Sequence, residues 1–569
     1  MSAMYSMRSL EDYDISPETG FLPPEPPLRR LPDPYFAPWE NMMDDFNGLL
    51  LAGKLREKIH KASLPLLDHT KLQDAREYQR AFLILCMLSH SYVWGKLEKT
   101  SETLPANLAV PWTEIANHLG LCPVVCHAAV VLWNYRLLDS EGPIDLSNLT
   151  AFATYSGSLD EAWFYLVTTA IESAGAPCLK AIVSSIDHVK DSDFEGLQND
   201  LATIETAVKN MNTVLERMFE KCDPYVFYWK IRPYLAGWEN MAEAGLPFGL
   251  IYEGVDSHWH AETDEYGDMS HLSEGERLLR QYRRYAGGSA AQSSLIAALD
   301  VALGVEHFPT GQKPPVMKLD TSNDRYTHLP STMPADELKS AGSASPRTPS
   351  SFVRTNRNAF LRAMRKYMPR PHREFLEDLE LAGNLRPFML DLQERLQFGE
   401  ATEEEVRLLE LYNGCVHQLK LFRDKHVQIV SLYIVSQARK GPNIAHGGFA
   451  IDKKSTKVEE PEQPSTDNAT KTPHNVLYPQ TALETAPVIR EGSVSAKMTH
   501  LFPQLGLAKY VDPKTGVVRG TGGTNVMPFL KQSRDETKST KLDLNSEPQQ
   551  SQDNHNSSQK SWSEWIMRR

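Results

Sequence analysis

Apolar residues recur at helical spacing through most of the first half of the chain, from Asn41 to about residue 240. The stretch DEAWFYLVTTAIESAGAP, residues 160–177, is apolar nearly all round, which predicts a buried helix that stops at its Gly and Pro. Residues 194–224 have an amphipathic pattern and predict another helix, closed by Pro224. Because strand signals are few, the pattern predicts a mainly α fold, with any short β-strands near the N-terminus.

A long helical pattern covers residues 402–440, with clear signals at both ends. Thr402 followed by Glu405 is a capping-box pattern, typical of a helix start. The basic pair at 439–440 suits a last helical turn, and the Gly-Pro pair that follows is a stop signal. The Asn-Gly pair at 413–414 could interrupt the segment, so the pattern alone leaves open one long helix or two.

Three parts of the chain lack this helical pattern. Residues 11–39 are rich in Pro and predict an extended arm that lies on the first domain. Residues 308–352 and 441–515 are too poor in apolar residues to offset the entropy of ordering, so we expect loops or disorder there. The chain therefore divides into an extended Pro-rich arm (1–39), a small helical domain (40–120), a large helical domain with the first disordered insertion (121–440), the second disordered insertion (441–515), a short region with the final helix (516–535) and a polar tail (536–569).

Composition and charge narrow the class of protein. The 569 residues are 41% hydrophobic and 23% charged, which is typical of a soluble globular protein. The formal net charge of −13 disfavours binding to nucleic acid, and no basic cluster offsets it. The N-terminus is acidic where a signal peptide needs an apolar core, and the most apolar run, residues 81–95, is too short for a membrane span. We therefore expect a soluble, cytoplasmic protein with no membrane partner. A monomer is the expected state, but the sequence leaves the oligomeric state open.

Motifs for acid–base or nucleophilic catalysis are missing from the sequence. No catalytic triad, carboxylate pair or nucleophile motif stands out. The six cysteines lie mostly in apolar runs without the spacing of a zinc site, so we interpret them as buried free thiols of a reducing compartment.

Candidate chemistry is concentrated at one histidine. The 402–440 segment has an apolar face whose members are four, four and three residues apart: Phe422, His426, Val430 and Tyr433. A histidine on such a face is most often a core residue whose ring nitrogens are satisfied by hydrogen bonds. A single imidazole nitrogen that faces an apolar pocket is also what a haem iron needs on its proximal side. Spacing alone does not decide between these interpretations.

Several short motifs occur along the chain in a fixed order. They are SYVWGK, LPANLAVPW, IRPYLAGW, GLIYEG, GGSAAQSS, MRKYMPRPHREFL, KHVQIVSLYI and GTGGTNVMPFLK. In this order they resemble the indoleamine 2,3-dioxygenase family of haem enzymes, and the match spans about residues 40–535, interrupted by the two insertions. The resemblance implies a small, mostly helical N-terminal domain, a larger all-helical haem-binding domain, and a pocket between them.

The resemblance also implies haem b and residues that contact it. His426, in KHVQIV, matches the proximal iron ligand of the family. Arg423 stands one turn earlier, where it could pair with a haem propionate or face solvent, and Asp300 matches an acid that pairs with Arg423. Ser289, in GGSAAQSS, belongs to backbone close to the haem, where small residues allow a close approach. His372, in RPHREF, is the competing histidine, but it follows two prolines and fits a helix start or a packing role better.

For substrates, the resemblance implies L-tryptophan and O2, with an electron donor that keeps the haem ferrous. Both oxygen atoms would enter across the indole C2–C3 bond to give N-formylkynurenine, the first step of the kynurenine route to NAD. Arg232 matches the arginine that binds the amino-acid carboxylate, a task that suits a guanidinium fork. No catalytic acid or base is implied, and the protein would act by positioning. The other implied substrate contacts are Phe164, Thr168, Phe227, Tyr228, Ala290 and Thr521.

The motif GTGGT, residues 520–524, matches a flexible lid that closes over the substrate. The rival interpretation is a dinucleotide-binding loop. It is weak because the last glycine of G-x-G-x-x-G is missing and no strand–helix unit surrounds the motif.

Four positions depart from better-known members of the family. His127 stands in place of a Tyr at the pocket edge, Thr168 in place of Ser, and Tyr228 in place of Phe. Thr168 adds a methyl group and Tyr228 adds a hydroxyl group, so these two are expected to crowd the distal site. Pro233 disfavours α geometry at Arg232 and could change the direction of its side chain. Because these changes affect turnover more than haem binding, the sequence leaves three hypotheses: a tryptophan dioxygenase, a haem-binding member with weak catalysis that acts as a sensor or buffer, and a helical interaction protein without haem.

Overall fold

The computed structural model of the chain describes residues 7–61, 64–95, 99–255, 281–312, 358–440, 520–521 and 525–544. Over these residues the fold is mainly α, as the sequence predicts. The short strands β1 (Thr103–Leu104), β4 (Leu250–Tyr252) and β5 (Tyr282–Arg283) form one sheet, and β2 (Tyr135–Leu137) and β3 (Leu149–Ala151) form a hairpin. Strands therefore extend beyond the N-terminal region, and the parallel pairing of β1 with β4 joins segments far apart in the sequence.

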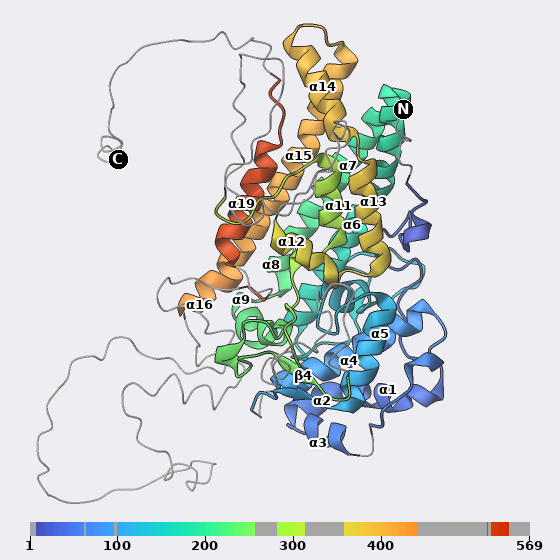
Figure 1. Ribbon diagram of the computed structural model, residues 1–569, viewed down its shortest axis with the longest axis vertical. Helices are drawn as coiled ribbons and strands as arrows, with labels where there is room; N and C mark the ends of the chain where they lie inside the picture. The colour runs from blue at the N-terminus through green and yellow to red at the C-terminus, as the bar shows by residue number, and fades with distance from the viewer. Residues whose placement is uncertain are drawn as a thin grey trace, which may run out of the picture.

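The N-terminal helices form the lower part of the molecule in Figure 1. They are α1 (Ala37–Asp44), α2 (Phe46–Leu51), α3 (Leu55–His60), α4 (Ala75–Trp94) and α5 (Ala106–Leu119). α4 is buried along most of its length because apolar side chains cover it nearly all round. A later segment packs on α4 through the rings of His90, whose Nδ1 donates to Tyr234 O at 2.9 Å, and Trp94, whose Nε1 donates to Ala236 O at 3.1 Å.

Longer helices form the upper part of Figure 1. They are α6 (Leu159–Asp191), α7 (Phe194–Glu216), α11 (Ser294–Leu303), α13 (Arg370–Ala382), α14 (Leu385–Gln397), α15 (Glu403–Val430) and α19 (Val526–Ser539). α7 lies between α6 and α15, and α19 packs on α15. Shorter helices connect them: α8 (Met218–Lys221), α9 (Pro224–Val226), α12 (Ala359–Met364) and α16 (Ser436–Lys440). Pro224 thus opens α9 instead of closing α7, a position that suits proline because the first helical turn needs no N–H donor.

α6 continues through Gly175 and Pro177, so the prediction that it stops there is wrong. Gly175 serves packing, since an added Cβ would lie 2.3 Å from Cδ2 of Leu295 on α11. Burial against α7 and α11 offsets the hydrogen bond that Pro177 cannot make. Among the described residues, α6 is also the one helix long and apolar enough to cross a membrane, but most of its apolar stretch is buried inside the protein, as in a core helix.

α15 is one helix that passes through the Asn-Gly pair at 413–414 without a break. The predicted capping box of Thr402 and Glu405 is present at its start. The Asn-Gly pair serves contacts with other elements: Asn413 exchanges two hydrogen bonds with Leu542, and Gly414 leaves room for the carboxylate of Glu205 on α7. A π-helical turn, Ser431–Val435, joins α15 to α16.

The N-terminal arm packs on both parts of the molecule. Tyr13 donates a hydrogen bond of 2.6 Å to Asp378 on α13, and the ring of Phe21 lies 4.7 Å from that of His372 on the same helix. Further along, Phe36 stacks on Trp39 among the N-terminal helices. The arm therefore does not lie on the first domain alone, because its early aromatic residues are buried against α13.

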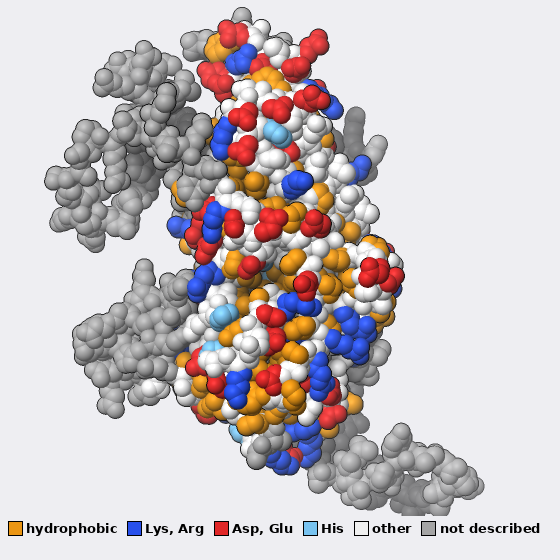
Figure 2. Space-filling view, turned by 90° about the vertical axis from the view of Figure 1, so that its right-hand side faces the viewer, with side chains coloured by type: hydrophobic (Ala, Val, Ile, Leu, Met, Phe, Trp, Pro, Cys, Tyr) orange, Lys and Arg blue, Asp and Glu red, His pale blue; other side chains and the backbone are white. Residues whose placement is uncertain are grey.

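The two predicted disordered insertions fall outside the described residues, apart from 308–312. The predicted polar tail begins too early. α19 runs to Ser539, and Thr537 and Leu542 are buried, so residues 536–544 belong to the fold. On the face seen in Figure 2, acidic and basic side chains are interspersed, with apolar side chains between them.

Candidate active site

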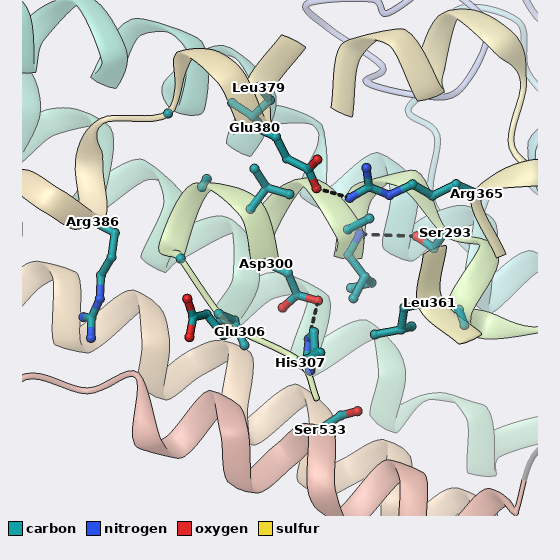
Figure 3. Close-up of a pocket in the computed structure, with 18 of the residues that line it drawn as sticks. Ser293, Asp300, Glu306, His307, Leu361, Arg365, Leu379, Glu380, Arg386 and Ser533 are labelled. Carbon is teal, nitrogen blue, oxygen red and sulfur yellow. Dashed lines mark hydrogen bonds and ion pairs between the residues drawn. The ribbon is translucent and has the colours of Figure 1, made fainter. Parts of the chain in front are cut away.

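A cavity of about 740 Å³ lies where α11, α13 and α14 face α15 and α19. Figure 3 shows side chains that line it from helices on both of these sides. Its volume falls within the range of about 300–1,000 Å³ that is typical of small-molecule and cofactor sites. At the corner between α13 and α14 it reaches the surface, because Leu381 and Leu390 line it and are 54% and 40% exposed. The predicted site residues that line it are Ala290, Asp300, Arg423 and His426.

α15 presents His426 to the cavity one turn after Phe422. Burial lowers the pKa of His426 to about 4, and the nearby positive charge of Arg423 acts in the same direction. The imidazole is therefore neutral at pH 7 and keeps a nitrogen lone pair. His90 is different: it lies in a packed core, and both of its ring nitrogens are hydrogen-bonded. His426 thus has the setting of a ligand more than that of a core histidine.

Arg423 and Asp300 form a largely buried ion pair beside His426. Nη2 of Arg423 donates to both carboxylate oxygens, at 2.8 and 2.7 Å, and Nη1 donates to Thr537 on α19. Burial alone would raise the pKa of Asp300, but Arg423 and His307 outweigh it and hold that pKa below its usual range. The predicted pairing is confirmed, and a contact between Arg423 and a haem propionate stays a prediction.

Phe164 and Phe227 lie together, with ring centroids 4.7 Å apart. The ring of Tyr433, just beyond α15, is 5.8 Å from that of Phe227. Phe164 and Thr168 share a face of α6, and the Thr168 hydroxyl donates to the backbone oxygen of Phe164 at 3.0 Å. These residues are not part of the lining of the 740 Å³ cavity. They form a separate aromatic group that borders the segment following the His426 helix.

Tyr228 and Arg232 belong to another group. Arg232 is completely buried, and its guanidinium carbon lies 5.1 Å from the centre of the Tyr228 ring. Tyr228 packs against the segment that follows α15. Arg232 keeps α-region angles, φ −50° and ψ −38°, although Pro233 follows it. The helix accommodates the proline by changing from a π turn, Phe227–Ile231, to a 3-10 turn, Arg232–Leu235.

Two loops cross each other with their backbones in contact. A Cβ added to Gly287 would lie 2.2 Å from the oxygen of Leu235 and 2.4 Å from the nitrogen of Gly237. Gly287 N also donates to Thr521 O at 3.1 Å, and the Thr521 hydroxyl donates to Gly288 O. The first residues of the predicted lid therefore rest on the same loop that the Arg232 segment crosses.

The small residues that follow this crossing form a helix cap. The Ser289 hydroxyl accepts a hydrogen bond of 3.2 Å from Ala291 N, and Ser289 and Gln292 form a capping box around a 3-10 turn. Ala290 and Ala291 line the cavity, but Ser289 does not. The predicted role of Ser289 at the haem stays a prediction, and its observed role is to hold the loop that carries Ala290.

His127 belongs to a buried polar cluster that the sequence did not indicate. Its Nε2 lies 2.8 Å from Oε1 of Glu172, and the Ser293 hydroxyl donates to the same oxygen at 2.8 Å. The backbone N–H of His127 donates to Gln292 at 3.1 Å. Ser293 lines the cavity, so the cluster stands directly behind its wall. The available signal was Glu172 itself, the one charged side chain in the stretch 162–179 of α6.

Two further histidines, His372 and His307, lie on or near the elements that form the cavity. His372 lies in the first turn of α13 against Phe21, so the prediction of a helix-start and packing role is confirmed. His307 lines the cavity beside Asp300, as Figure 3 shows. No sequence pattern indicated this role, because His307 borders a predicted disordered insertion and its partner Glu536 falls in the predicted polar tail.

The cavity wall fits a haem better than a bare metal ion. It offers one neutral imidazole, mostly apolar side chains around it, and a cation one turn away. Within the described ranges, no group of three or more His, Cys, Asp or Glu side chains could hold a metal ion. All six cysteines are buried free thiols, as predicted.

The fold is mainly helical, and comparisons with known proteins show that the chain is an oxidoreductase of the dioxygenase class. The sequence profile described as indoleamine 2,3-dioxygenase matches residues 9–540. The chain belongs to the indoleamine 2,3-dioxygenase family. It is 33% identical to the indoleamine 2,3-dioxygenase of Saccharomyces cerevisiae over 93% of both chains. It is 28% identical to human indoleamine 2,3-dioxygenase 2, over 93% of this chain and 94% of the human one, and 29% identical to a 6-hydroxytryptophan 2,3-dioxygenase of Fusarium equiseti, over 75% and 86%.

Proposed function

We propose that this protein is a haem-dependent dioxygenase that inserts both atoms of O2 across the indole C2–C3 bond of L-tryptophan and releases N-formylkynurenine. Its family membership supports the dioxygenase reaction. The cofactor would be haem b, kept ferrous by an electron donor. We place the reaction in the cytoplasm, as the first step of the kynurenine route to NAD.

The observation that carries the proposal is the neutral imidazole of His426 in the wall of a large, mostly apolar cavity. A protonated imidazole has no lone pair for a metal, so the lowered pKa of His426 favours ligation at neutral pH. The Arg423–Asp300 pair and its bond to Thr537 tie α15, α11 and α19 together beside that ring. They would hold the ligand helix in place.

Haem, when bound, supplies the iron chemistry that uses O2, and the protein supplies binding and orientation. Arg232 would pair with the carboxylate of tryptophan, and Phe164 and Phe227 would pack on the indole ring. Thr521 would lie near the substrate amino group, since it rests on the loop that leads to Ala290. Closure of the lid over this region would exclude water from the reaction.

The identity of the substrate needs its own test, because one relative is named for 6-hydroxytryptophan. Thr168 and Tyr228 carry hydroxyl groups near the proposed site, and hydroxyl groups can bind a hydroxylated ring. Turnover should therefore be measured with tryptophan and with 6-hydroxytryptophan under the same conditions. A higher kcat/KM for 6-hydroxytryptophan would replace tryptophan as the proposed substrate.

The decisive experiment uses the full chain produced with added haem precursor. The wild-type protein is expected to show a Soret band and, with tryptophan, O2 and a reductant, to form N-formylkynurenine. His426→Ala is expected to lose the band. His417→Ala is the matched control, because His417 is an exposed histidine on the same helix, and it should keep both the band and the activity.

Each result selects one hypothesis. A band with product supports the dioxygenase. A band without product favours a haem-binding sensor or buffer, and no band favours a helical interaction protein. A His426→Ala protein that still holds its haem would overturn the assignment of the proximal ligand.

A further inference from the structure

His307 lies between two carboxylates that come from different helices. Its Nδ1 is 2.7 Å from Glu536 on α19, and its Nε2 is 3.1 Å from Asp300 on α11. The side chain is only 2% exposed. Figure 3 shows its contact with Asp300 at the cavity wall.

The geometry defines the protonation state of this ring. An ionised carboxylate only accepts hydrogen bonds, so both ring nitrogens of His307 must carry a proton to bond Asp300 and Glu536. A histidine with two N–H groups is an imidazolium. The charge balance agrees, because Arg423 supplies one positive charge to the cluster and the two carboxylates supply two negative charges. Protonated His307 makes the cluster neutral.

Burial by itself would lower the pKa of His307, but Asp300 and Glu536 outweigh burial and the repulsion by Arg423, so the pKa is raised above its ordinary value. These are the charged groups that face His307 from α11, α19 and α15. Glu306, its neighbour in the chain, is exposed. His307 therefore keeps its proton to a higher pH than a free imidazole does, and loses it as the pH rises through the raised pKa.

Glu536 ties α19 to this cluster through several bonds. Its carboxylate also accepts from the backbone N–H of Phe308 at 3.1 Å and from the amide of Gln532 at 2.7 Å. One residue further along, Thr537 accepts the bond from Arg423. The same helix contributes Phe529, Leu530 and Ser533 to the cavity wall, and it begins shortly after the predicted lid.

We infer that His307 is a positioning residue: as an imidazolium between Asp300 and Glu536, it holds α19 against the Arg423–Asp300 pair and so keeps that wall of the cavity in place. Loss of its proton leaves two carboxylates on either side of a neutral ring, with Arg423, which bonds Asp300 and Thr537, as the one cation of the cluster, and α19 loosens. The effect on α19 stands without the proposed function. Only its consequence, faster haem loss at alkaline pH, rests on the proposed haem site.

The test is hydrogen–deuterium exchange of residues 526–539 in the full chain from pH 6 to pH 9, with α7 as the internal reference for intrinsic exchange. A group with a raised pKa stabilises the fold fully below its unfolded value and loses that effect as pH rises through the folded value. Protection of α19 in the wild type should therefore fall about tenfold for each unit by which the pKa is raised. α7 should show no such step.

Two variants separate this charge effect from a purely structural one. His307→Gln should show low protection of α19 at pH 7 and no step with pH. Glu536→Gln keeps the shape and an acceptor for Phe308, but it removes one negative charge, so the step should move to lower pH. His417→Gln, the same substitution at an exposed site on α15, should behave as the wild type.

A second readout follows haem transfer to apomyoglobin, which should be faster for the wild type at pH 9 than at pH 7 and independent of pH for His307→Gln. An exchange profile that is the same in His307→Gln and the wild type, or unmoved in Glu536→Gln, would overturn the inference. If the protein held no haem, the exchange profile would still test whether His307 holds α19 in place. If it held haem and α19 showed no step, this inference alone would fail.

Discussion

Burial has different consequences for the two residues expected to meet the haem and the substrate. It lowers the pKa of His426 to about 4, so the ring is neutral at pH 7 and can serve as a ligand. It also lowers the pKa of Arg232, but a guanidinium starts at 12.5 and stays charged. The same physical cause leaves one residue as a metal ligand and the other as a cation suited to a carboxylate.

The first prediction concerns Arg232. Arg232→Ala is expected to keep the Soret band and to raise KM for tryptophan roughly 30- to 1000-fold, which corresponds to a loss of about 2–4 kcal/mol for a bidentate pair. Arg232→Lys keeps the charge without the fork and should give an intermediate KM. Steady-state kinetics and spectra of the same samples measure both effects. An unchanged KM in Arg232→Ala would remove this residue from the substrate site.

At the scale of elements, the candidate site depends on the unbroken helix α15 and on the loop that carries Ala290. α15 runs unbroken, so Arg423 and His426 keep the one-turn spacing that places both in the cavity wall. The loop that carries Ala290 is held by the capping box of Ser289 and by its crossing with the segment after Arg232. Distortion of the crossing would therefore move the cavity wall, the Arg232 segment and the first lid residues together.

Gly287→Ala tests this crossing. The added Cβ would meet backbone atoms of Leu235 and Gly237 at 2.2 and 2.4 Å, and backbone cannot move aside as a flexible side chain can. We expect a loss of about 1–3 kcal/mol in the free energy of unfolding and a raised KM, measured by urea unfolding and steady-state kinetics. Gly288→Ala is the control, because its Cβ would meet only Val125 at 3.8 Å, and it should be near neutral. Equal effects of the two substitutions would argue against the crossing.

At the scale of the whole molecule, segments distant in sequence join the two parts. The arm reaches α13 through Tyr13, and the segment after Arg232 packs on α4 through the rings of His90 and Trp94. The cavity that contains His426 lies among the helices of the larger part, whereas Arg232 lies close to the junction. A pocket between the two parts therefore stays a prediction, as does a substrate bound by Arg232.

Buried histidines predict how the stability of the whole molecule depends on pH. Burial lowers the pKa of His90 and of His372 to about 3, and that of His426 to about 4. Between the unfolded value of 6.5 and these folded values, the unfolded chain binds more protons, so stability falls as pH falls. Between its folded and unfolded pKa values, each histidine contributes up to about 1.4 kcal/mol per pH unit to the slope of the free energy of unfolding. Above the unfolded value it contributes nothing to that slope.

Urea unfolding of the full chain between pH 6.5 and pH 5.5 measures this slope. His90→Gln removes one titrating ring and should lower the slope by up to about 1.4 kcal/mol per pH unit, whatever its effect on absolute stability. His417→Gln provides the exposed control. A slope of zero in the wild type would show that these rings are not neutral in the folded protein.

Much of the fold was readable from local sequence. The mainly α class, the capping box of Thr402 and Glu405, and the packing role of His372 all follow from side chains a few residues apart or from helical spacing. The grouping of the aromatics was not readable in this way. Phe227 and Tyr228 are adjacent, but one packs on Phe164 and the other beside Arg232, because neighbouring side chains on a helix point in different directions.

By itself the sequence determined the helical class and the family motifs, since these depend on residue type and on the spacing of residues near one another in the chain. The role of His426 as a metal ligand rests on the family resemblance and stays a prediction. Only the tertiary structure decided that α6 passes through Pro177 and that His307 meets Glu536 from beyond the insertions. The physical reason is that burial and ion pairing between segments distant in the chain contribute more energy at these positions than local helix signals do. Such long-range contacts produce no repeating pattern of residue types, so they cannot be predicted from the sequence in this way.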